Sequence, residues 1–308
     1  MIKHFAIGIV TLAVILSPWV TGGKYELHIA TMVAIMGMLA LSMNLMLRIG
    51  QLSMAHGAFM GLGAYTTALL CMKLNMPPVL AIVIAGLMVG LIAIVLGTIF
   101  LRIKGIYFVL LTYAFGEIIN LIFQEWVSLF GGNNGLYGVP KLSAFGYRLT
   151  DPGTYYLLTV VFVAATYLLI RKIFRSNIGA ILDSLEQDEP LSQSLGVNPL
   201  SWRIGVFAVS AMLASVAGSL YAFKIGFLSP QAFSFSLSVD LVVMNVVGGA
   251  LSPIGPLLGA LIIVPLPELL RSVKDYQLLC YGVVLLVFLV FFRDGLMGLI
   301  KKTQKAAI

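Results

Sequence analysis

The polar side chains of this sequence that could bind a solute or carry a proton stand inside runs of apolar residues. Asn44, Ser53 and His56 cluster around one interruption of such a run, and Asn245 precedes a second interruption by a few residues. Polar side chains are costly at membrane depth, so those that occur there are candidates for a solute pathway or a proton relay. We therefore treat these four residues as candidate pathway residues.

Two ionisable side chains in these runs have alternative interpretations. Glu117 and Asn120 are three residues apart, on one face of the helix that their run predicts. Glu117 could carry a proton in an ion-coupled transporter, or it could form a structural bond to a neighbouring helix end. His56 has no Cys, Asp or second His near it in the sequence. We therefore expect a structural hydrogen bond there and no metal site.

Motifs of catalytic and nucleotide-binding proteins are missing from the sequence. It contains no Gly-x-x-x-x-Gly-Lys-[Ser/Thr], no His-Glu-x-x-His and no Gly-x-Ser-x-Gly. We therefore do not expect an enzyme, and we expect no cofactor in this chain. If ATP drives its activity, the ATP is hydrolysed by another chain.

The composition excludes an ordinary soluble domain. Of 308 residues, 60% are hydrophobic and only 10% are charged, whereas soluble domains carry about 25% charged residues. The net charge is +7, but the basic residues stand singly at the ends of apolar runs and are not gathered on one face. This pattern indicates membrane topology and argues against nucleic acid as a partner.

The elements that must position the polar residues are helices, because lipid forces each backbone group to be satisfied internally. The sequence predicts an all-α polytopic membrane protein, with about ten transmembrane helices in one domain, residues 1–308, and with some of these helices broken or re-entrant. The apolar runs lie at residues 4–20, 27–47, 54–72, 78–101, 106–124, 153–170, 204–223, 237–251, 256–270 and 276–292. No Ala-x-Ala-like cleavage site follows the first run, which we interpret as a spanning helix.

The basic residues predict the orientation of these helices. If the N-terminus is cytoplasmic, 12 of the 19 Lys and Arg residues lie inside and 7 lie outside. Because basic residues resist translocation, both termini are expected in the cytoplasm. The turn-rich segment 125–152 is then a periplasmic loop, and segment 171–203 is a cytoplasmic loop.

The cytoplasmic loop 171–203 predicts a short amphipathic helix. Ile178, Ile181, Leu182 and Leu185 fall at i, i+3, i+4 and i+7, so a helix starting near Asn177 presents one apolar stripe. Ser176 or Asn177 can cap this helix, Pro190 ends it, and Leu191–Leu195 can form a further turn closed by Gly196. Its polar face is acidic, whereas helices that lie on lipid favour Lys and Arg. We expect this helix to dock into a groove on a protein partner.

Two interruptions of the apolar runs share a sequence pattern. Gly50-Gln51-Leu52-Ser53 and Gly249-Ala250-Leu251-Ser252 are each followed by Gly-x-x-x-Gly, at Gly57/Gly61 and Gly255/Gly259. Repeated, interrupted hydrophobic segments are typical of a transport pathway at the interface of two repeats. Close helix packing through the small residues is the alternative, and the sequence leaves both open.

The first interruption carries a family resemblance. Residues 50–65, GQLSMAHGAFMGLGAY, resemble the signature of the branched-chain amino-acid ABC transporter permease family, and specifically its LivM-like subunit. Further matches follow in order: AFGEII at 114–119, GGNNG at 131–135, SNIGA at 176–180, NVVGG at 245–249, GPLLGA at 255–260 and FRDGL at 292–296. The resemblance therefore covers nearly the whole chain.

The resemblance implies an ATP-driven importer of the bacterial inner membrane that works by alternating access. It implies a heterodimer with a second, H-type permease, two cytoplasmic ATPase chains that hold ATP and Mg, and a periplasmic solute-binding protein, in a setting of membrane lipid. The expected solutes are leucine, isoleucine and valine. Another small solute, such as urea, an amide or an organic acid, and an ion-coupled secondary transporter remain alternatives.

The resemblance and the patterns together give two groups of candidate residues. The expected substrate path comprises Asn44, Ser53, His56, Gly57, Glu117, Asn245 and Gly248. The expected ATPase-coupling residues are Asn177, Gly179, Ile181, Leu182, Leu185, Glu186, Glu189 and Gly196. Family members typically carry Arg-Ala-Ile-Arg-Glu-Asn in the docking loop, whereas residues 181–186 here contain no basic residue.

Overall fold

The computed structural model describes residues 23–144, 147–148, 151–250 and 252–270, together with positions 276, 279, 281–283, 286 and 295–296. The predicted first helix, 4–20, and most of the predicted last run, 276–292, lie outside the described residues.

Helices make up most of the described chain. The principal helices are α2 (Lys24–Arg48), α3 (His56–Lys73), α4 (Pro78–Phe100), α5 (Ile106–Glu125), α7 (Pro152–Arg175), α10 (Pro199–Ile225), α11 (Phe235–Gly248) and α12 (Gly255–Ile263). Shorter helices are α6 (Val127–Phe130), η1 (Gly132–Asn134), α8 (Asn177–Gln187), α9 (Glu189–Ser194), η2 (Pro230–Phe233) and α13 (Leu266–Leu269). Within the described residues, six helical segments are long and apolar enough to cross a membrane. The polytopic helical class is confirmed, and the count of about ten helices stays a prediction.

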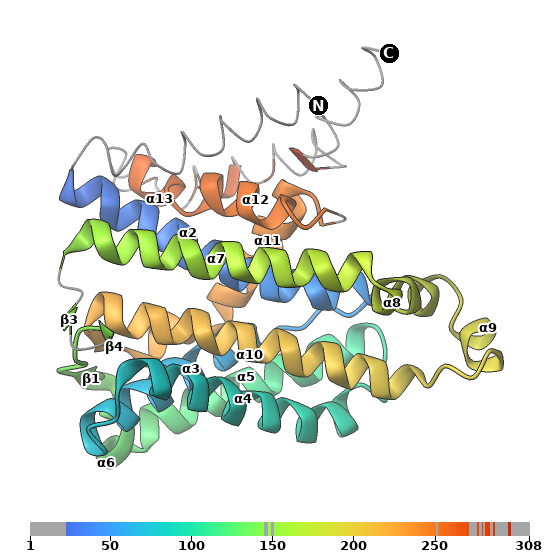
Figure 1. Cartoon of the computed structure of the whole chain (residues 1–308), viewed down its shortest axis with the longest axis horizontal. Coiled ribbons are helices and arrows are strands. Elements are labelled where there is room, and N and C mark those ends of the chain that lie inside the picture. The colour runs from blue at the N-terminus through green and yellow to red at the C-terminus, as the bar shows by residue number, and fades with distance from the viewer. Residues whose placement is uncertain are drawn as a thin grey trace, which may run out of the picture.

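Helix α10 lies at the centre of the bundle. It packs against α3, α4 and α2, while α11 and α12 pack on α2 from the other side (Figure 1). The contact between α10 and α3 depends on small residues, because a Cβ atom on Gly218 would lie 1.9 Å from the carbonyl oxygen of Met60. Helices associate in membranes through such close backbone approach. Phe59 and Phe207 fill the adjoining core, with ring centroids 5.4 Å apart.

The connecting segments gather at two opposite ends of the bundle. Helices α8 and α9 lie at one end, and four short strands lie at the other: β1 (Leu136–Tyr137), β2 (Ser143–Ala144), β3 (Tyr147–Arg148) and β4 (Phe227–Leu228) (Figure 1). Strand β1 pairs with β4, and β2 pairs with β3, both antiparallel. The pairing of β1 with β4 thus brings segments 125–152 and 225–230 together. The predicted topology places both segments on the same side of the membrane.

Two predicted helix boundaries are wrong. The predicted run 256–270 is two helices, α12 and α13, because Pro265 has no N–H to donate and ends the hydrogen-bond ladder. The predicted amphipathic helix ends at Gln187, before Pro190. Asp188 leaves the helical conformation, at φ −150°, and its carboxylate accepts from the backbone N–H of Leu191. The predicted further turn is present as α9, and Gly196 closes it at φ +85°.

Candidate functional site

Both interruptions of the apolar runs are breaks between helices. The first, residues 49–55, separates α2 from α3, and the second, beginning at Gly249, separates α11 from α12. Gly50 has φ +69° and Gly249 has φ +106°, conformations that side chains with a Cβ atom rarely adopt. The glycine that opens each Gly-x-Leu-Ser pattern therefore makes the turn out of a helix.

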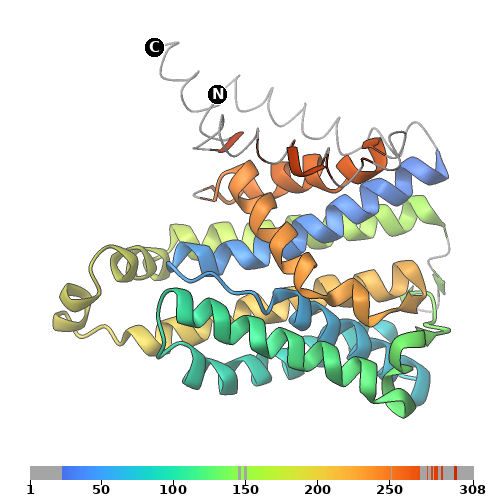
Figure 2. The same cartoon turned by 180° about the vertical axis from the view of Figure 1, so that it is seen from behind.

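Helix α11 links the two breaks and crosses the bundle obliquely between them (Figure 2). Near its beginning, the Ser238 hydroxyl donates to the carbonyl oxygen of Met54, 2.8 Å away, and accepts from the N–H of Gly57. Ser238 thus joins α11 to the last residues of the first break.

The other end of α11 is held by the two predicted asparagines. Asn44 Nδ2 donates to Asn245 Oδ1 at 3.0 Å and to the carbonyl oxygen of Ala250 in the second break at 2.7 Å. Asn245 Nδ2 donates in turn to the carbonyl oxygen of Ala40. The bond to Ala250 satisfies a backbone carbonyl at a helix interruption, where lipid offers no hydrogen-bond partner, and the bond to Ala40 ties α11 to the interior of α2.

His56 forms the structural hydrogen bond that the sequence predicts. Its Nε2 lies 2.7 Å from the hydroxyl oxygen of Ser210. That hydroxyl donates to the carbonyl oxygen of Ser42, and the other ring nitrogen, Nδ1, lies 3.3 Å from the carbonyl oxygen of Ser53. The imidazole thereby ties the first residue of α3 to α10 and to α2.

The predicted path residues in the two breaks are enclosed by protein. Asn44, Ser53, His56 and Asn245 have no exposed surface, and Gly57 and Gly248 are buried. A Cβ atom on Gly248 would lie 1.8 Å from the carbonyl oxygen of Gly255, so these glycines allow the close helix packing that was the alternative to a pathway. That these residues line a path stays a prediction.

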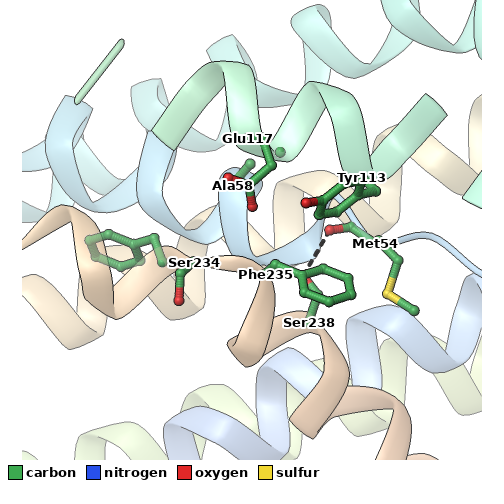
Figure 3. Close-up of a pocket in the computed structure, with 9 residues that line it drawn as sticks. Met54, Ala58, Tyr113, Glu117, Ser234, Phe235 and Ser238 are labelled. Carbon is green, nitrogen blue, oxygen red and sulfur yellow. Dashed lines mark hydrogen bonds between the residues drawn. The ribbon is translucent and has the colours of Figure 1, made fainter. Parts of the chain in front are cut away.

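Glu117 has different surroundings. It is half-buried and lines a small hollow between α5 and the start of α11, together with Met54 of the first break, Tyr113, Ser234 and Phe235 (Figure 3). The ring of Tyr113 packs edge-on against that of Phe235, with centroids 4.7 Å apart. Met54, which is half-buried, brings the end of the first break to this hollow. Asn120 lies deeper and donates to the carbonyl oxygen of Pro230.

The predicted coupling helix, α8, packs on its own chain. Leu182 and Leu185 are buried, and α8 contacts α7 and α2. A Cβ atom on Gly179 would lie 2.3 Å from the carbonyl oxygen of Phe174, so this glycine permits the sharp turn from α7 into α8. Two side chains of the predicted stripe therefore anchor α8 within the bundle. Their role in ATPase contact stays a prediction.

The remaining predicted coupling residues lie outward. Ile181 is half-buried, and Asn177, Glu186 and Gly196 are exposed. The exposed large apolar side chains of α8, of α9 and of the residue after α9 are Ile178, Leu191 and Leu195, of which Leu195 is 77% exposed.

Glu189 connects α9 to the transmembrane helices. Its carboxylate accepts from Arg203 of α10 at 2.9 Å and pairs with Lys104 of the loop between α4 and α5. Partial burial opposes ionisation of this carboxyl, but the hydrogen bonds and charges of Lys104 and Arg203 outweigh it and lower its pKa. A second pair joins Asp183 of α8 to Arg48 at the end of α2, with the two side chains 3.6 Å apart.

The sequence of this chain matches a known protein family. The family model described as branched-chain amino acid transport system / permease component matches residues 26–292. The chain belongs to this permease family. No solved structure matches it significantly.

The permease has relatives along almost its whole length. It is 29% identical to the high-affinity branched-chain amino acid transport system permease protein LivM of Escherichia coli (strain K12), over 98% of this chain and 76% of that protein. It is 28% identical to the LivM protein of Salmonella typhimurium (strain LT2), over the same shares. It is also 25% identical to the ribose import permease protein RbsC of Haemophilus influenzae (strain Rd), over 85% of this chain and 82% of that protein.

Four residues of the permease site escaped the sequence analysis. Ser210, Ser238, Lys104 and Arg203 form bonds that hold the breaks and α9 in place. The two serines are ordinary small residues of apolar runs, and the two cations were counted only as topology signals. No local sequence pattern indicates these four residues, because each forms its hydrogen bond or ion pair with a residue of another element.

Proposed function

We propose that the permease is one of two membrane subunits of an ATP-driven importer of branched-chain amino acids in the bacterial inner membrane. The similarity to two proteins named as branched-chain amino-acid permeases, over 98% of the chain, is the observation that carries this proposal. A second, H-type permease completes the membrane part, two ATPases bind on the cytoplasmic side with ATP and Mg, and a periplasmic protein delivers the solute. The ribose permease relative favours another small solute as the second candidate.

The orientation follows from the basic residues. The end of the bundle that carries α8 and α9 is the cytoplasmic end, because Arg48, Lys104 and Arg203 lie there, and basic residues resist translocation. Both termini are then cytoplasmic, and the β1 to β3 segment is periplasmic.

The ATPase contact is assigned to the exposed apolar side chains of α8 and α9. Ile178, Leu191 and Leu195 are exposed, whereas Leu182 and Leu185 are used within the chain. An exposed apolar set on a short helix suits a groove on a partner. Gly179, Glu189 and Asp183 then serve coupling indirectly, by fixing α8 and α9 to α7, α10 and α2.

Coupling is by alternating access. When ATP closes the ATPase pair, α8 and α9 move, and the bonds of Glu189 pass this movement to α10 and to the loop before α5. Helix α10 also holds His56 at the start of α3. Displacement of α10 therefore reaches the first break and the hollow at Glu117, where solute passes between this chain and the second permease.

Reconstitution tests the proposed function. The complete complex, with its ATPases and binding protein, is placed in proteoliposomes, and uptake of labelled leucine, ribose and urea is measured with and without ATP. ATP-dependent leucine uptake that survives ionophores is expected. Uptake by this chain without any ATPase, or uptake of ribose and not leucine, would contradict the proposal.

A pair of matched substitutions tests the docking surface. Leu195→Asp places a charge in the proposed ATPase contact, and we expect the membrane subunits to stay assembled while transport-coupled ATP hydrolysis is lost. Leu74→Asp is the control, because Leu74 is 65% exposed and stands at the opposite end of the bundle. Equal transport by the Leu195→Asp variant and the native protein would remove α9 from the ATPase contact.

A further inference from the structure

Glu117 is a carboxylate near the middle of a membrane-spanning helix. It lies about 17 Å along α5 from Ile106, at 1.5 Å per residue. Within the described residues its side chain has no hydrogen bond and no ion pair. A charge at this depth is costly unless a partner compensates it. Any group that compensates the charge of Glu117 therefore comes from outside the described part of the chain.

The hollow at Glu117 forms one wall of a site. Glu117 and Tyr113 of α5 line it together with Ala58 and Met54, and the Tyr113 hydroxyl lies on the side of Glu117 (Figure 3). In this conformation the chain by itself leaves about 0 Å³ there for a water-sized molecule, whereas complete ligand pockets typically enclose roughly 300–1,000 Å³. The second wall of a complete site is then supplied by another chain on the outer side of α5, where Leu110, Ile118 and Leu121 are exposed.

We propose that Glu117 binds the ammonium group of the amino acid as it passes through the permease. This inference rests on the proposed function. An ammonium group offers charge-assisted hydrogen bonds to a carboxylate, and the ring of Tyr113, one helical turn away, attracts a cation through its face. A sugar carries no cation to compensate Glu117, and an organic acid is repelled by it. Glu117 thus favours solutes that carry an amino group.

A charge-removing substitution tests this role in the complete reconstituted complex. Glu117→Gln keeps the size of the side chain and is expected to slow leucine uptake at least about tenfold, with the complex intact. Glu125→Gln is the matched control, because Glu125 is an exposed glutamate at the end of the same helix. Glu117→Asp keeps the charge and is expected to retain part of the uptake.

Two outcomes would overturn the proposal. Leucine uptake by Glu117→Gln within about twofold of the native rate would exclude a solute contact. Loss of the second permease from the purified variant would instead assign Glu117 to an ion pair between subunits. If the native complex moves no leucine at all, the proposed function fails, whatever the variants do.

Labelling of the native complex gives a reading that does not depend on any variant folding. A hydrophobic carbodiimide modifies carboxyl groups at membrane depth, and peptide mass spectrometry measures its adduct on Glu117. Leucine is expected to slow this labelling, and ribose is expected to leave it unchanged. If Glu117 is labelled equally fast with and without leucine, the proposal is overturned.

Discussion

Removing the charge of Glu189 is expected to loosen α9 from the transmembrane helices. Glu189→Gln deprives Arg203 of the carboxylate 2.9 Å away, and the Arg203 side chain is only 7% exposed. A hydrogen bond to a charged group contributes about 1.5–3 kcal/mol, while the pair with the largely exposed Lys104 contributes about 0–1 kcal/mol. The Glu189 side chain is itself 17% exposed, and Gln still accepts one hydrogen bond. We therefore expect the free energy that holds α9 against α10 to decrease by about 2 kcal/mol.

Hydrogen exchange measures this loss locally. A decrease of about 2 kcal/mol in the free energy of opening makes backbone amides of residues 189–196 exchange roughly 30-fold faster, since 1.4 kcal/mol corresponds to a factor of ten. Glu186→Gln is the control, because Glu186 is exposed and makes no ion pair among the described residues. Unchanged exchange of this peptide in Glu189→Gln would refute the view that Glu189 fastens α9.

Three further predictions concern packing and pH. Asn245→Ala removes a bond to the carbonyl oxygen of Ala40 and should destabilise the protein by about 1–2 kcal/mol, read as a lower Tm in detergent. Gly218→Ala places a Cβ atom 1.9 Å from the carbonyl oxygen of Met60, so α3 and α10 must separate and the yield of folded protein should fall; native yield would contradict this packing. The pKa of Glu189 is lowered from its ordinary 4.5, so its stabilisation is complete above that pH and is lost as pH falls through the folded pKa. The Tm difference between the native protein and Glu189→Gln should therefore shrink as the pH falls below 4.5.

The helical membrane class and the two breaks could be predicted because their signals are local. Apolar runs of about 20 residues indicate spanning helices. Gly50 and Gly249 mark the breaks, since only glycine adopts their backbone conformation without strain. The boundary at Asp188 was missed because its carboxylate captures the N–H of Leu191, and that local bond ends α8 before Pro190 does.

The role of each polar residue could not be predicted in the same way. The sequence marks Asn44 and Asn245 as pathway candidates. In the structure they are hydrogen-bonded to each other across 201 positions of sequence, and both side chains are buried. A sequence marks a polar residue as costly at membrane depth and does not say which group compensates it. Glu117, selected by the same rule, has no such bond within the described residues and lines the hollow.

The amphipathic helix shows most clearly what the sequence determined and what tertiary structure decided. The spacing of Ile178, Ile181, Leu182 and Leu185 determined that a helix would form with one apolar stripe, because the helical period is a property of consecutive residues. Only the fold decided that Leu182 and Leu185 pack on α7 and α2 while Ile178 stays exposed. Periodicity places side chains on one face, and the choice of what covers that face belongs to elements distant in the sequence.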